Sequence, residues 1–397
     1  MKYLAFIKVA QREIEIISHS KSARMLLVFL PLVLYVFLAF IYQKGTLRDI
    51  PVAVYDNDHS ALSRKVISFI ESSPAMKITS YLSSDDDVKK FFLNHDVHAV
   101  FYIPPGFSKD VYKNKPTRLV VYTNSSNIVY GNILYRECAV ISTTVSSGII
   151  LTRLEHAGIN HNEAMGLVMP VFTDTKTLYN PWFNYLYYLL PGLMTVLLQM
   201  FIFFAATRAF NREITQGTFQ QLVQISKNSP LQMLLGKALA YFAMGMSIIM
   251  TISLIYLAFG IPFQHLEVEL ILLFSVLVVV NIFLGFLLST TLDEEIFALD
   301  VAFFYNSPAF VFSGFTFPMF GMPFYSSVYA QFIPYTHFLH AFFKLYQMGT
   351  PLHYIISDLK ILGIFLLTGF FTSWVALKLR LVNNRSKKPK TVVEVVS

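Results

Sequence analysis

The chain has 397 residues, of which 55% are hydrophobic, 16% aromatic and only 14% charged. An ordinary soluble domain carries about 25% charged residues, so the composition excludes one large soluble globule and a soluble enzyme. Six windows contain no Asp, Glu, Lys or Arg: 25–43, 177–207, 238–266, 270–292, 301–343 and 361–377. Because about 20 apolar residues cross a bilayer as a helix, these windows predict a polytopic α-helical membrane protein with six transmembrane helices.

The net charge of +7 is unevenly distributed. Lys and Arg gather in residues 1–24, in residues 208–227 and in a basic tail at 381–397. The positive-inside rule places these stretches in the cytoplasm, with both termini inside. Basic residues that flank spans do not indicate a nucleic-acid surface, and no nucleic-acid partner is expected. The same topology puts the acidic turn Asp293-Glu294-Glu295 inside, although acidic residues contribute little to orientation.

Residues 1–24 predict an amphipathic helix in the inner headgroup plane, ahead of a first transmembrane helix at 25–43 that acts as an uncleaved signal anchor. One helical face collects the apolar side chains Tyr3, Phe6, Ile7, Ala10, Ile14 and Ile17. The other positions carry the charged side chains Lys2, Arg12, Glu13 and Glu15. We therefore expect Glu13 to face water.

Residues 44–176 have a soluble composition and predict an extracytoplasmic α/β domain between the first two spans. Apolar runs near 51–56, 76–82, 98–103 and 118–122 alternate with helical patterns at 60–72, after Ser84 and at 129–157. Asp85, Asp86 and Asp87 fit the first turn of a helix better than a cation site. The histidines lack metal-binding spacing, and Cys138 is interpreted as a small buried hydrophobic residue.

Residues 211–222 read NREITQGTFQQL, and Leu235-Gly236-Lys237 opens the third predicted span. This order resembles the signature of ABC-2 type permeases, the membrane subunits of a class of ABC exporters. The matching residues are Arg212, Glu213, Gly217, Thr218, Leu222, Gly236 and Lys237. In that family the stretch is a cytoplasmic coupling helix, expected here at about 209–230. Without the resemblance, an ordinary interfacial helix fits equally well. The resemblance implies that Arg212 and Glu213 meet a partner and that Gly217 permits a close approach.

The resemblance extends to candidate pathway or gate residues in the membrane half. The uncharged window 301–343 is too long for one helix, so we expect a span to about residue 317 and a re-entrant segment at about 318–345 within the unit 177–380. The candidates are Pro191, Gly192, Asp300, Pro308, Ser313, Gly314, Pro318 and Pro323. Asp300 lies near enough to the inner interface that a solvated carboxylate fits it better than a functional role. His337 and His340 share a helical face, where an interfacial hydrogen-bonding role is expected over metal binding.

No Walker A pattern occurs, because Gly236-Lys237 is followed by Ala238. The resemblance therefore implies a permease without cofactor or catalytic residues, whose ATP and Mg²⁺ are bound by two copies of an ABC ATP-binding subunit. It further implies a homo- or heterodimer of permease chains in the bacterial inner membrane, surrounded by membrane lipids, that exports an amphipathic, drug-like or lipid-like substrate. A periplasmic adaptor is a further candidate partner. The alternative is a non-transporting receptor or scaffold with an extracytoplasmic sensor domain.

Overall fold

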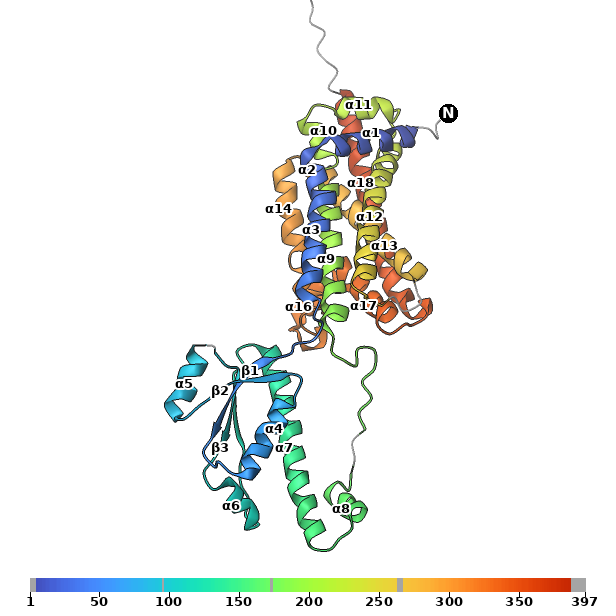
Figure 1. The fold of residues 1–397 in the computed structure, drawn as a ribbon. Coiled ribbons are helices and arrows are strands. Elements are labelled where there is room, and N and C mark those ends of the chain that lie inside the picture. Colours follow the sequence, from blue (N-terminus) through green and yellow to red (C-terminus); the bar gives the residue numbers. More distant parts are fainter. Residues whose placement is uncertain (1–4, 95, 172–173, 263–266, 387–397) are drawn as a thin grey trace, which may run out of the picture. The chain divides into compact units, whose positions relative to one another are not determined.

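The computed structural model describes residues 5–94, 96–171, 174–262 and 267–386. The predicted tail 381–397 and the N-terminal Tyr3 therefore lie largely or wholly outside the described residues. The chain divides into two compact units (Figure 1). The membrane unit comprises Met1–Gly45 and Thr177–Ser397, and the α/β domain comprises Thr46–Lys176.

The α/β domain is built on a four-stranded sheet with the strand order β2-β1-β3-β4. β1 (Ile50–Asp56), β2 (Met76–Tyr81) and β3 (Ala99–Ile103) are parallel, and β4 (Val120–Thr123) pairs antiparallel with β3. All four strands were predicted. Parallel strands need apolar side chains on both faces because helices cover both sides, and β1 and β3 are buried along most of their lengths.

Helices cover both faces of this sheet. α4 (Ala61–Glu71) and α7 (Ile128–His156) pack on one face through a shared apolar core, and α5 (Asp85–Leu93) packs on the other. The Ser84 hydroxyl caps α5 by accepting from the Asp87 amide at 3.2 Å, so the three aspartates form a helix start, as predicted. The short helices α6 (Phe107–Tyr112) and α8 (His161–Val168) were not predicted.

The membrane unit holds six helical segments that are long and apolar enough to cross a membrane among the described residues. They are Met25–Tyr42, Tyr185–Thr215, Pro230–Ala258, Val268–Thr291, Glu295–Phe312 and Leu352–Val382. Their main helices are α3 (Leu30–Tyr42), α9 (Tyr185–Thr207), α12 (Pro230–Ala258), α13 (Glu267–Thr291), α14 (Glu295–Asn306) and α18 (Ile356–Ser386). The chain is thus a polytopic helical membrane protein.

The fifth of these segments ends earlier than predicted. α14 is followed by Pro308 and the single turn α15 (Ala309–Phe312), and Gly314 then takes a φ of +87°, which ends the helix before residue 317. Four short helices follow before α18: η2 (Met319–Gly321), α16 (Phe324–Gln331), α17 (Pro334–Tyr346) and η3 (Leu352–Ile355). Each begins at or just after a proline, because proline lacks the N–H that the first helical turn leaves unused.

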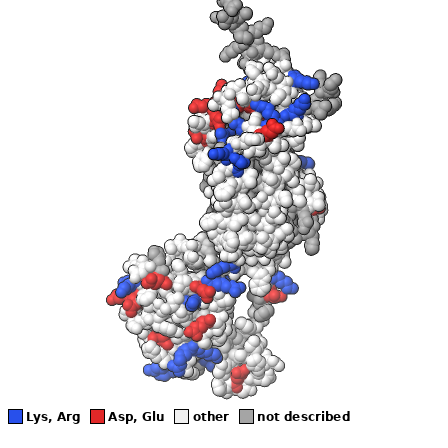
Figure 2. Space-filling view, turned by 45° about the horizontal axis from the view of Figure 1, so that its top comes forward, with Lys and Arg blue, Asp and Glu red and all other residues white. Residues whose placement is uncertain are grey.

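The N-terminal part of the membrane unit consists of α1 (Ala5–His19), α2 (Lys21–Arg24) and the π-helical turn η1 (Met25–Phe29), which leads into α3. α1 packs against α12 at the end of the unit that also carries α10 (Asn211–Thr215) and α11 (Phe219–Ile225). Figure 2 shows charged side chains gathered at this end, next to a band of the membrane unit that has almost none.

Candidate functional site

The segment that the sequence predicts as one coupling helix forms two. α10 and α11 are separated by a turn at Gly217, whose φ is +71°. A left-handed conformation is inexpensive only for glycine, which explains a glycine here. The prediction of a single helix at about 209–230 was wrong. The periodicity of apolar residues does not reveal that one residue takes a left-handed conformation and interrupts the helix.

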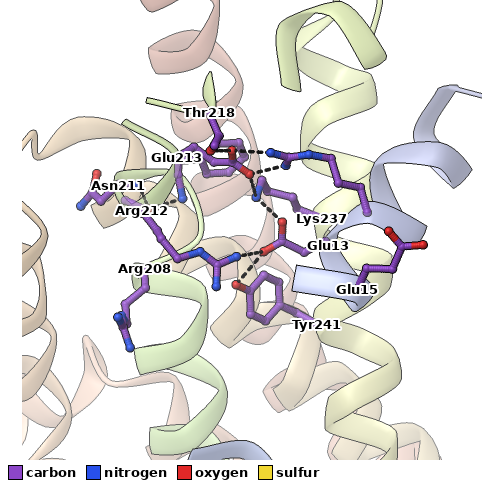
Figure 3. Close-up of polar contacts among 12 residues, drawn as sticks. Glu13, Glu15, Arg208, Asn211, Arg212, Glu213, Thr218, Lys237 and Tyr241 are labelled. Carbon is purple, nitrogen blue, oxygen red and sulfur yellow. Dashed lines mark hydrogen bonds and ion pairs between the residues drawn. The ribbon is translucent and has the colours of Figure 1, made fainter. Parts of the chain in front are cut away.

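A buried cluster of charged side chains joins α10 to α12 and to α1 (Figure 3). The Glu213 side chain is only 1% exposed and accepts two parallel hydrogen bonds from the Arg12 guanidinium, at 2.6 and 3.0 Å. The Lys237 ammonium donates to the same carboxylate at 2.9 Å, and the Thr218 hydroxyl also donates to it. A bidentate Arg–carboxylate pair fixes the relative orientation of its two side chains in addition to pairing their charges. The pair between Arg12 and Glu213 therefore holds α1 in a fixed position relative to α10.

Glu13 forms the second carboxylate of the cluster and is fully buried. It accepts from Arg212 at 3.2 Å, from the Tyr241 hydroxyl at 3.1 Å and from Lys237. Lys237, itself fully buried, therefore bridges Glu13 of α1 and Glu213 of α10. Three cations (Arg12, Arg212, Lys237) face two carboxylates, so removing a carboxylate leaves buried positive charge uncompensated, whereas removing a cation takes a direct partner from a buried carboxylate.

Glycine lets α1 approach α12 closely. A Cβ atom on Gly236 would lie 2.5 Å from the Val9 Cβ and 2.6 Å from the Phe6 carbonyl oxygen, both on α1. Leu222 of α11 is fully buried in the core of the membrane unit. The signature residues on α10, α11 and α12 thus lie around the place where α1 packs against α12 and pairs with α10.

The roles expected for two parts of the signature differ in the structure. Arg212 and Glu213, expected to meet a partner, turn inward and pair within the chain because Glu13 and Lys237 neutralise them. Gly217, expected to permit a close approach, is surrounded by open space: a Cβ atom added to it would meet no described atom within 4 Å, and its φ is the reason for glycine. The surface left exposed on α10, on α11 and on the turn between them is uncharged: Ile214, Thr215, Gln216, Gly217, Gln220, Gln221 and Gln224.

Sequence reasoning also missed Glu13 and Arg12. The apolar face that it predicted for α1 leaves Ile7 39% and Ile14 42% exposed, whereas Glu13 is buried. Glu13 follows Ala5 and Val9 and precedes Ile17 at spacings of four, so it lies on the side that packs against the unit. The sequence offered one signal: Glu13 is a carboxylate in a row of otherwise apolar residues, Ala5, Val9 and Ile17, that lie four positions apart.

Two of the three carboxylates of the acidic turn 293–295, the weak point of the predicted topology, pair with basic residues of other spans. Arg208, after α9, donates to Glu295 at 2.6 Å, and Arg380 of α18 donates to Asp293 at 2.7 Å. The turn therefore lies at the same end of the membrane unit as these basic residues. Opposite charges at this end offset each other, which removes the apparent conflict.

Some candidate gate residues come together where α9 meets the residues after α15. A Cβ on Gly192 would collide with the Phe315 ring, and the Tyr188 hydroxyl donates to the Phe315 carbonyl at 2.8 Å. Pro191, beside Gly192 in α9, is buried. Ser313 and Gly314 lie next to this contact in sequence and form the turn after α15, whereas Pro308, Pro318 and Pro323 precede α15, η2 and α16.

Asp300 does not join that group. It is exposed and lines a groove of about 530 Å³ with Arg208 and with apolar residues that include Leu30 of α3, Phe204 of α9 and Phe303 of α14. His340 has an acidic neighbour that the sequence analysis did not identify: its Nδ1 lies 2.9 Å from Asp358 Oδ1, and Lys344 Nζ lies 3.1 Å from the other oxygen. Asp358 was missed because it belongs to α18. The described residues contain no group of three or more potential metal ligands.

Comparison with known proteins identifies a family. A family model described as "ABC-2 family transporter protein" matches residues 21–375. A search of curated proteins gives no match. The matched range includes the α/β domain, Glu213 and Lys237, whereas Arg12 and Glu13 precede it. Since the match covers most of the sequence, the chain belongs to the ABC-2 transporter family and is a multi-pass membrane permease, as its sequence predicted.

Proposed function

We propose that this chain is the permease subunit of an ATP-driven exporter that moves an amphipathic substrate, drug-like or lipid-like, out across the bacterial cytoplasmic membrane. Permeases of this family generally work with a separate ABC ATP-binding subunit. The absence of a Walker A pattern from the sequence agrees with ATP hydrolysis on another polypeptide. Two such subunits and a homo- or heterodimer of permeases complete the proposed assembly.

The charge cluster is the observation that carries this proposal. The uncharged exposed face of α10 and α11 is the proposed docking surface for the ATP-binding subunit. A displacement of α10 would be passed through Glu213 and Lys237 to α12, and through Arg12 to α1. Buried, close-packed contacts move as units and do not deform continuously. The cluster would therefore transmit a displacement from the ATP-binding subunit to the transmembrane helices.

The proposed orientation puts α1, α10, α11 and the 293–295 turn inside and the α/β domain outside the cytoplasm. The basic residues Arg208 and Arg380, which pair with the acidic turn, support it through the positive-inside rule. The groove beside Asp300 offers apolar walls from three helices and two charged side chains, Asp300 and Arg208, which suits an amphipathic substrate. A periplasmic adaptor would meet the α/β domain.

Transport in cells tests this function with a matched pair of glycine variants. Gly217→Leu alters the proposed docking surface, and Gly158→Leu alters an exposed glycine after α7; both glycines have a positive φ, and neither Cβ would contact a described atom. We expect Gly217→Leu to abolish efflux of fluorescent amphipathic dyes while leaving the amount of membrane-inserted protein unchanged, and Gly158→Leu to export normally. Wild-type export by Gly217→Leu would refute the coupling assignment.

A further inference from the structure

The α/β domain contains a cavity of about 360 Å³ between α4, α6 and α7. Its walls are mainly apolar, with Leu62, Val66 and Phe69 from α4 and Val145 and Ile149 from α7. Small-molecule sites commonly have volumes of about 300–1,000 Å³ and apolar linings with few polar groups. The volume lies near the lower end of this range, which suits one ligand with a single, small apolar body.

Basic side chains contribute to the lining of this cavity, and acidic ones do not. Lys65 of α4 and Arg153 and His156 of α7 belong to the lining. One Arg153 N–H group donates to the Val111 carbonyl, which fixes the guanidinium beside the cavity and leaves its other N–H groups available. Lys65 has no ion-pair partner among the described residues, whereas the cations of the charge cluster are all paired with carboxylates.

The two threonines of the lining offer little to an anion. The Thr144 hydroxyl donates to the Val140 carbonyl and the Thr152 hydroxyl to the Gly148 carbonyl, each at 2.8 Å. Their single hydrogens are thus already used. Recognition of a charged head group would therefore fall to Lys65, Arg153 and His156, and the Tyr112 hydroxyl is a further donor in the lining.

Gly148 keeps part of the cavity open. It lies within α7, lines the cavity, and a Cβ added to it would meet no described atom within 4 Å. Glycine inside a helix is unfavourable by about 1 kcal/mol relative to alanine. Its presence is therefore not explained by packing or by helix stability, and it leaves space where a ligand body can lie.

We infer that this cavity binds an amphiphile with one anionic head group, a carboxylate, sulfonate or phosphate, and one apolar body. The apolar walls take the body, and Lys65 and Arg153 take the head group. This site is independent of the coupling role proposed for α10 and α11, and it gives the α/β domain a ligand of its own.

Photolabelling of the full-length protein in phosphatidylcholine nanodiscs tests the inference. The probe is a medium-chain fatty acid that carries a diazirine, and the control probe is the amine with the same chain. We expect the acid, but not the amine, to label peptides from residues 61–69 and 144–156, with competition by an alkyl sulfonate. Labelling confined to the transmembrane helices, or equal labelling by both probes, would overturn the inference.

Two pairs of variants localise the binding. Gly148→Leu fills the cavity and should remove the labelling, whereas Gly166→Leu in α8 should not. Lys65→Glu should weaken apparent affinity for the acid by about tenfold or more, and Arg64→Glu, the same charge change next to it on α4 but outside the lining, should have little effect. Slow alkylation of Cys138 in each variant verifies that the domain is folded. Unchanged labelling in a folded Gly148→Leu variant would contradict the site.

Discussion

Substitution of Lys237 by methionine should destabilise the membrane unit by about 3 kcal/mol. Removing one partner of a buried ion pair typically costs about 3–5 kcal/mol, because the other charge stays buried. Here both carboxylates keep other donors: Arg12 binds Glu213 through two hydrogen bonds, and Arg212 and Tyr241 bind Glu13. The loss is therefore expected at the low end of that range.

Equilibrium unfolding by SDS in mixed micelles, followed by circular dichroism, measures this change. Lys8→Met, the same substitution at an exposed position of α1, is the control and should change the free energy of unfolding by less than about 0.5 kcal/mol. A double-mutant cycle with Glu13→Gln isolates the pair, and we expect a coupling energy of about 2 kcal/mol. Additive effects, or a loss below about 1 kcal/mol for Lys237→Met, would refute the cluster as a stabilising link between α1 and α12.

Three further outcomes are expected. Gly236→Ala should cost about 1–3 kcal/mol by overpacking against Val9 and should make α1 more sensitive to protease; unchanged protection would contradict the close approach. Gly192→Ala should lower thermal stability because its Cβ meets the Phe315 ring, whereas Gly363→Ala, with open space at its Cβ, should not. Burial, with a contribution from Glu137, raises the pKa of Cys138 to about 11, so its alkylation should be slow at pH 8 and accelerate about tenfold per pH unit up to pH 10; rapid alkylation at pH 8 would refute this.

The α/β domain was largely predictable because its signals are local. Apolar runs such as 98–103 are bounded by turn residues, and Ser84 followed by three aspartates specifies a helix start. α6 and α8 were missed because helices of six and eight residues produce little periodicity. Residues of the family signature were also identifiable, since their order along the chain is distinctive.

The charge cluster was not predictable in the same way. Glu13 lies 224 positions before Lys237, and a carboxylate is buried only where such a partner exists. The amphipathic pattern of α1 therefore assigned Glu13 to water. Gly217 illustrates a second limit: sequence does not distinguish a glycine that allows close packing from one that adopts a positive φ, and the structure assigns these roles to Gly236 and Gly217 respectively.

The central claim is that a separate ATP-binding polypeptide drives this permease through α10 and α11. Affinity purification of the tagged chain from gently solubilised native membranes, with mass spectrometry of the proteins that accompany it, tests this most directly. The account predicts a near-stoichiometric partner with a Walker A motif that is lost in the Gly217→Leu variant and retained in Gly158→Leu. Purification of the wild-type chain as a stable oligomer without any ATP-binding protein would contradict the account and favour a receptor or scaffold.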